Sequence, residues 1–226
     1  MRTMTLALYA EGSTDGDFLP KIIERTAKNI LAQHSSQSIQ VRLPYSKWNK
    51  PVDIVKRDQC ILYIARETSI YDALIIHSDG DHRGYEQTLS ELFEPGKKLV
   101  LEAKDKAEEI CSDLVPLIPV RMTEAWMLAD PDALCTVLGK KAEARVLGIP
   151  TKAKLVEKEL KPKKTLEQII QAAYPQQSRD WKYFKLKLYK ELGSEISLTR
   201  LNEVPSYHQF VEDMTTVLQA LNFIQK

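Results

Sequence analysis

The stretch Asp72-Ala73-Leu74-Ile75-Ile76-His77-Ser78-Asp79-Gly80-Asp81-His82 decides the expected fold of this chain. It begins with an apolar run that is long enough for one buried strand and too short for an independent helix, and it stops at two aspartates separated by a glycine. In open α/β sheets, ligands bind outside the carboxyl ends of the strands. We therefore expect Asp79 and Asp81 at such an edge, where carboxylate oxygens bind a hard cation.

Segments with strand and helix patterns alternate on both sides of this stretch. Residues 6–10 and 39–43 predict strands, and the apolar spacing of residues 18–31 and 54–65 predicts helices. A run with two prolines, residues 115–121, predicts a strand at a sheet edge or one whose backbone donors are not needed, because proline donates no backbone hydrogen bond. This order predicts an α/β fold in which a mostly parallel sheet is flanked by helices.

Three helix starts are expected from capping residues. Asp15 or Asp17 is suited to cap the first helix, and Asp130 followed by Pro131 predicts another start. Thr165-Leu166-Glu167-Gln168 has the pattern of a capping box, which predicts a third.

The composition changes after Gly139, where lysines accumulate and apolar runs become shorter. We expect residues 1–138 to form the α/β domain and residues 139–226 to form a basic helical extension packed on the same core. Its basic side chains could neutralise phosphates of a nucleic acid, although lysines mixed with glutamates fit a solvated helix face equally well. The candidates for nucleic-acid binding are Lys163, Lys164, Arg179 and Lys182.

The overall composition limits the class of protein. The chain has 226 residues and a formal net charge of +1, so its total charge gives no general attraction to nucleic acid. Three widely spaced cysteines have no metal-ligand spacing and predict free thiols in a reducing compartment. No stretch has the pattern of a signal peptide or a membrane span, so we expect a cytoplasmic protein without membrane association.

Three strand-like runs end in acidic residues. If these strands are parallel, their carboxyl ends share one edge and the acids converge. Converging carboxylates raise each other's pKa unless a cation neutralises them, and Mg²⁺ binds such a site without histidine or cysteine. Glu11 and Asp15 follow the first run, Asp79 and Asp81 follow the third, and Glu124 follows the run with the two prolines.

Each of these acids also has a structural explanation. Asp15 could serve a helix start, Asp79-Gly80-Asp81 has a common turn composition, and Glu124 could interact with a helix dipole. His77 and His82 are interpreted as structural or exposed. Only the occurrence of acids at successive strand ends favours a functional site.

The segment Glu11-Gly12-Ser13-Thr14-Asp15 and the later Asp79-Gly80-Asp81 resemble the Toprim domain of topoisomerases, primases and OLD-type nucleases. Three further segments, around residues 118–121, 124–130 and 161–164, more closely resemble an uncharacterised bacterial family called domain of unknown function 4276. That second resemblance covers nearly the whole chain.

The resemblance implies a Toprim-like fold with Glu11, Asp79 and Asp81 as catalytic residues. Glu11 would be a general base or acid near the metal, and Asp79 and Asp81 would bind Mg²⁺ or Mn²⁺. Asp15 and Glu124 would be supporting or second-metal acids.

The expected function is that of a magnesium-dependent nuclease that cleaves DNA or RNA. The chain is too short for a topoisomerase and has no Gly-x-x-x-x-Gly-Lys-[Ser/Thr] sequence, so any ATPase would be a separate partner. By resemblance, such a partner is expected because relatives are often encoded near ATPases in bacterial antiphage-defence or mobile-element loci. A homodimer is also an open alternative. The alternatives are an inactive scaffold or sensor module for an ATPase and an enzyme that hydrolyses a small phosphorylated metabolite.

Overall fold

The computed structural model describes residues 2–10, 12, 14–47, 54–139, 148, 150, 152–174 and 181–225. The side chains of residues 47 and 181–183 lie outside this description. The strands are β1 (Arg2–Met4), β2 (Leu6–Tyr9), β3 (Ile39–Val41), β4 (Tyr45–Lys47), β5 (Ala73–His77) and β6 (Leu114–Leu117). The helices are α1 (Asp15–His34), α2 (Arg57–Glu67), α3 (Gly84–Thr88), the π-helical turn η1 (Leu89–Phe93), α4 (Glu94–Asp105), α5 (Thr123–Met127), α6 (Pro131–Val137), the 3₁₀ segment η2 (Ala153–Lys158), α7 (Pro162–Ala173), α8 (Trp181–Glu195), α9 (Leu198–Leu201) and α10 (Pro205–Ala220).

A four-stranded parallel sheet in the order β4-β2-β5-β6 forms the centre of the molecule. A second parallel pair, β1 and β3, extends it near the chain termini. The α/β fold with a mostly parallel sheet and flanking helices is therefore confirmed. The strand that contains Pro116 lies at a sheet edge, as its proline predicts.

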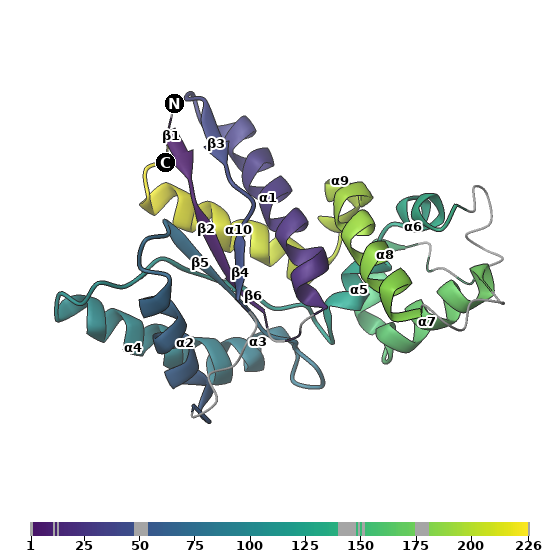
Figure 1. Ribbon diagram of the computed structural model, residues 1–226, viewed down its shortest axis with the longest axis horizontal. Coiled ribbons are helices and arrows are strands. Elements are labelled where there is room, and N and C mark those ends of the chain that lie inside the picture. The colour runs from purple at the N-terminus through teal and green to yellow at the C-terminus, as the bar shows by residue number, and fades with distance from the viewer. Residues whose placement is uncertain are drawn as a thin grey trace.

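Helices cover both faces of the sheet (Figure 1). Ala73 and Ile75 of β5 belong to a buried cluster with α1 and α10, whereas Leu74 and Ile76 belong to a second cluster with α2 and α4. Successive side chains of a strand point to opposite faces, so a strand covered on both faces is apolar throughout. This is why the run that precedes Asp79 shows no alternation of polar and apolar residues.

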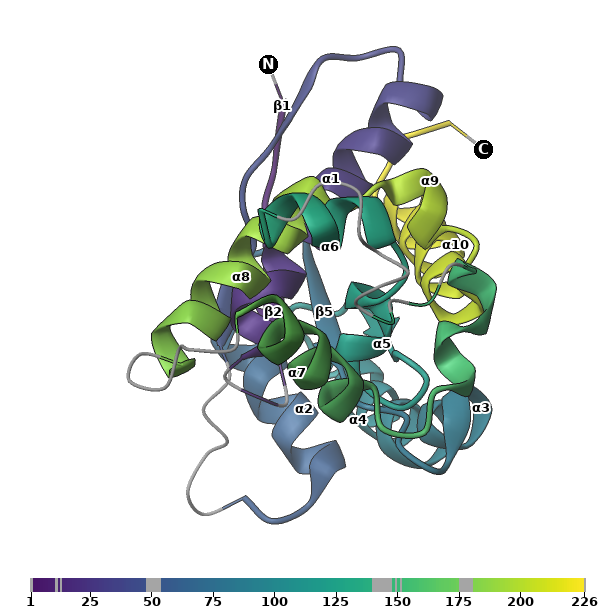
Figure 2. The ribbon, with the colours of Figure 1, turned by 90° about the vertical axis from the view of Figure 1, so that its right-hand side faces the viewer.

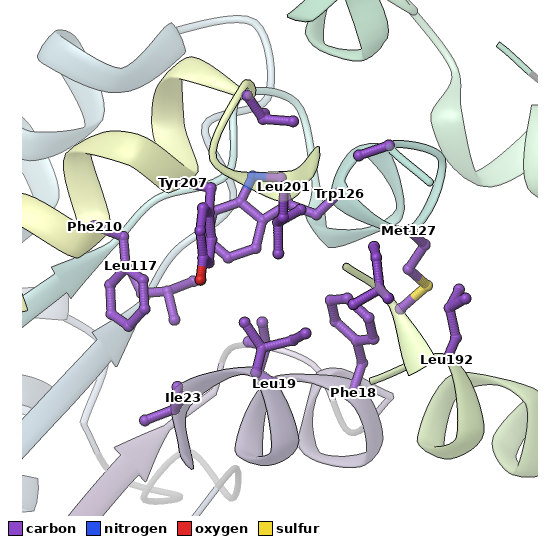
Figure 3. Close-up of a cluster of buried hydrophobic side chains, with 14 of the residues drawn as sticks. Phe18, Leu19, Ile23, Leu117, Trp126, Met127, Leu192, Leu201, Tyr207 and Phe210 are labelled. Atoms are coloured by element: carbon purple, nitrogen blue, oxygen red, sulfur yellow. The ribbon is translucent and has the colours of Figure 1, made fainter. Parts of the chain in front are cut away.

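The C-terminal helices share the first of these clusters. Trp126 of α5 is fully buried, with its ring edge against Tyr207 and a tilted contact with Phe210 of α10 (Figure 3). Figure 2, seen from the side of these helices, places α5, α7 and α8 in front of the sheet. Arg2 donates hydrogen bonds to the carbonyls of Leu221 and Asn222, which holds the two ends of the chain together.

Several expected boundaries differ from the structure. Strand β4 was not expected, and it is β4, not β3, that pairs with β2. The chain is helical from Gly84 to Asp105 without a break at Pro95, which lies in the first turn of α4. The helix continues from η1 into α4 because proline is tolerated in the first turn of a helix, where the backbone N–H that it lacks would have no partner.

Two of the three expected caps are wrong. Thr14, not Asp15 or Asp17, is the N-cap of α1 and makes no side-chain cap bond, and α7 begins at Pro162, ahead of the expected capping box. Asp130 does cap α6, where its carboxylate accepts hydrogen bonds from the backbone of Asp132 and Ala133. Among the described residues, no helix combines the length and apolar character that crossing a membrane requires.

Candidate active site

The turn after β5 is held against the chain that follows β6. Backbone pairing continues past the strand ends, with Gly80 N donating to Pro119 O at 2.9 Å and Asp81 N donating to Arg121 O at 2.9 Å. A Cβ atom at Gly80 would lie 2.9 Å from the Pro119 carbonyl oxygen, so this close approach requires glycine. The turn thereby fixes Asp79 at the carboxyl edge of the sheet.

His77, the last residue of β5, is fully buried between two of the acids. Its Nδ1 lies 3.7 Å from Asp15 Oδ2, and its Nε2 lies 3.3 Å from Asp79 Oδ1. Thr123 also approaches Nε2, with its Oγ1 at 3.1 Å, and its backbone N donates to Asp79 Oδ1 at 3.3 Å. The imidazole ring therefore separates and orients the two carboxylates.

Asp15 begins α1 and is only 7% exposed. Its Oδ2 accepts a hydrogen bond from Gly12 N at 3.0 Å. Burial raises the pKa of Asp15 above its ordinary value, the charge of Asp79 raises it further, and His77 and hydrogen bonds from Thr123 and Gly12 act in the opposite direction. The site thus contains a carboxylate whose negative charge is poorly solvated.

Glu124 lies in the first turn of α5 and is 6% exposed. Tyr189 of α8 donates a hydrogen bond from its hydroxyl to Glu124 Oε1 at 3.0 Å. Burial raises the pKa of Glu124, and the charges of Asp15 and Asp79 raise it further. Glu124 therefore interacts electrostatically with both other acids.

The remaining candidates are placed differently. Asp81 has a left-handed backbone and an exposed side chain 3.9 Å from Arg83, so it does not join the cluster of Asp15, Asp79 and Glu124. Glu11 and Arg179 lie outside the described residues, and so does the side chain of Lys182. Lys163 and Lys164 are exposed in the first turn of α7.

Three residues of the site were not expected from the sequence, namely His77, Thr123 and Tyr189. A histidine at the end of an otherwise apolar strand was a weak signal for His77. Thr123 precedes an acid that was singled out. Nothing in the sequence connects Tyr189 with Glu124, which lies 65 positions earlier.

A family described as Domain of unknown function (DUF4276) matches residues 10–215. The chain belongs to that family. No curated protein and no solved structure matches the chain.

The acids of the candidate site offer oxygen atoms, which are the ligands that a hard cation prefers. Among the described residues, no three His, Cys, Asp or Glu side chains are grouped closely enough to hold a metal by themselves. Mg²⁺, however, commonly takes one or two carboxylates and completes its shell with water and substrate phosphate. Asp15, Asp79 and Glu124 offer oxygen ligands, and a cation beside them would offset the repulsion that raises the pKa of Asp15 and Glu124.

Proposed function

We propose that this DUF4276 protein is a Toprim-like, magnesium-dependent nuclease that hydrolyses phosphodiester bonds in DNA or RNA. The observation that carries the proposal is the coupling of Asp15, Asp79 and Glu124 at the carboxyl edge of a parallel sheet. Ligands of open α/β sheets bind at this edge. The acids after β2 and after β5 are also what supports a relation to Toprim domains.

In this proposal Asp79 and Asp15 hold the cation, and Mn²⁺ could replace Mg²⁺. When bound, the cation would supply Lewis-acid stabilisation of the charge that develops on the phosphate. His77 and Thr123 keep the two carboxylates apart and oriented. Tyr189 holds Glu124 in place. Glu11, which the resemblance assigns as general base or acid, completes the proposed metal-binding and catalytic residues.

Metal binding gives the first test. Titration calorimetry of the wild-type protein with Mg²⁺ and with Mn²⁺ should show binding. Asp79→Asn should abolish this binding because the charged carboxylate ligand is replaced by a neutral amide. Asp113→Asn is the matched control, because Asp113 precedes β6 at the opposite end of the sheet. Equal affinity in all three proteins would contradict the assignment of Asp79.

Cleavage gives the second test. With Mg²⁺ or Mn²⁺ and supercoiled DNA, single strands or transfer RNA as substrates, Asp79→Ala and Glu11→Ala should reduce the rate by about a hundredfold or more. Thermal unfolding of each variant would establish that it is folded. Variants that cleave as fast as the wild-type protein would disprove the site.

The second candidate function is a catalytically inactive scaffold or sensor module for an ATPase partner. It is favoured by the lack of a complete metal-holding group among the described residues. Wild-type protein that binds neither cation and cleaves none of these substrates would support it. An ATPase partner in antiphage defence is compatible with either function.

A further inference from the structure

Arg57, the first residue of α2, lies at the same sheet edge as the acids but on the other face. Its Nη2 donates to the carbonyl of His77 at 2.6 Å and to the hydroxyl of Ser78 at 2.6 Å. Its guanidinium also lies over the ring of Tyr9, 4.8 Å from the centroid. These contacts fix the guanidinium of Arg57 beside Ser78, the residue before Asp79.

Part of this guanidinium has no hydrogen-bond partner among the described residues. Its Nε is buried without a hydrogen-bond partner, and within the described part of the chain only Nη2 has partners. No described carboxylate lies within ion-pair distance of Arg57. A half-buried charge with an unsatisfied donor is costly, and such groups in native proteins require an explanation.

The guanidinium of Arg57 is suited to bind an anion. Its neighbour Asp58, in the same first turn of α2, accepts a hydrogen bond from Gln59 N at 2.8 Å and does not pair with Arg57. Arg83, which follows the Asp79-Gly80-Asp81 turn, also has a buried Nε with no hydrogen-bond partner among the described residues. The planar guanidinium presents paired donors that match the oxygens of a phosphate.

We infer that Arg57 binds a phosphate of the substrate backbone beside Asp79. The inference rests on the proposed function for the identity of the substrate, since a nucleic acid supplies the phosphate. It places a substrate contact at the start of α2, at the carboxyl edge of the sheet, in addition to the expected contacts of the lysines of α7. Arg57 would hold the strand while the acids on the opposite face of β5 act on it.

Fluorescence anisotropy with short labelled DNA and RNA strands tests the inference without requiring cleavage. In Ca²⁺ or in EDTA, Arg57→Ala should bind these strands about tenfold more weakly than the wild-type protein does. The slope of log affinity against log salt concentration should also decrease by about the value of one phosphate contact. Arg42→Ala is the matched control, because Arg42 is exposed at the opposite end of the sheet. Its affinity should change by less than about twofold.

Arg57→Lys separates binding from a structural role. Lysine keeps the charge but has no planar fork, so we expect about a threefold weaker complex with an unchanged thermal midpoint. If Arg57→Ala does not fold, this variant decides: a threefold loss supports the inference, and wild-type affinity overturns it. An Arg57→Ala protein that is folded and binds like wild type, or an equal loss in Arg42→Ala, also overturns it.

Free phosphate is a second source of the same chemistry. If inorganic phosphate raises the thermal midpoint of the wild-type protein but not of Arg57→Ala, while neither strand binds, the site takes free phosphate and the nucleic-acid inference is overturned. Strands that bind through Arg57 without being cleaved would contradict the proposed function alone. Strands that are cleaved equally by wild type and Arg57→Ala, with equal affinity, would contradict the inference alone.

Discussion

Glu157 of η2 lies where three elements meet. Its Oε1 accepts hydrogen bonds from the backbone and the hydroxyl of Ser206 in α10, and the Ser206 hydroxyl in turn accepts from Trp126 Nε1 in α5 at 2.8 Å. Burial raises the pKa of Glu157 above its ordinary value of 4.5, while the bonds from Ser206 lower it. This one carboxylate therefore makes the stability of the fold depend on pH.

The sign of this dependence follows from proton linkage. Because the pKa is higher in the folded state, the folded protein binds the proton more tightly, and stability from Glu157 is lost as pH rises above about 4.5. Glu157→Gln has no such ionisation and keeps an acceptor for Ser206. Its stability relative to wild type should increase from pH 4.5 to pH 8 in a series of urea unfolding curves.

Exposed Glu203 provides the control for this series. Glu203→Gln should change stability by a constant and small amount over the same pH range. A Glu157→Gln protein whose stability difference from wild type is also constant would show that burial of Glu157 has no effect on its proton affinity.

At the scale of elements, helices α1 and α8 pack closely. Arg25 of α1 donates to the carbonyls of Gly193 and Ile196 at 2.9 and 2.7 Å. A Cβ atom at Gly193 would lie 2.8 Å from the backbone oxygen of Phe18. This contact matters for the site, because α1 begins with Asp15 and α8 carries Tyr189.

Gly193→Ala tests the contact between these two helices. Alanine favours a helix by about 1 kcal/mol over glycine, but a methyl group forced against a backbone oxygen costs about 1–3 kcal/mol. Since two hydrogen bonds from Arg25 hold the helices together, we expect a net loss of up to about 2 kcal/mol in the free energy of unfolding. Chemical denaturation measures it.

Ser194→Ala is the matched control on the exposed side of α8. Its stability should stay within about 0.5 kcal/mol of wild type. A Gly193→Ala protein that is more stable than wild type would mean that α8 can move away from α1 without cost.

At the scale of the whole molecule, the C-terminal helices complete the core of the α/β part. Buried side chains of α8 and α10, among them Leu192 and Phe210, belong to the same cluster as Phe18 of α1 and Leu117 of β6 (Figure 3). Removing these helices would expose this apolar face to water. Exposed apolar area costs about 25 cal/mol per Å².

A chain truncated after Leu138 therefore should not fold cooperatively. We expect broad thermal unfolding and loss of near-ultraviolet circular dichroism, whereas the full chain should unfold in one transition. A sharp transition in the truncated chain would instead establish residues 1–138 as an independent domain.

The order of the elements was determined by the sequence itself. The apolar run before Asp79 is a strand because it is too short for a stable helix and is buried on both faces. Parallel neighbours then require acids that follow successive strands to share one edge, which brings Asp79 near Asp15 and Glu124. Helix starts were less predictable, because tertiary packing outweighs the small free energy of a cap.

Only the tertiary structure decided which side chains complete the site. From the sequence, Asp79 and Asp81 were expected to act together, but the pairing of this turn with the chain after β6 leaves Asp79 half-buried against His77 and Asp81 exposed. His77, Tyr189 and Arg57 come from separate elements, and their contacts with the acids or the turn depend on how helices pack on the sheet. Local patterns record which face of an element is apolar, whereas the partner of a single polar side chain is fixed only when distant elements meet.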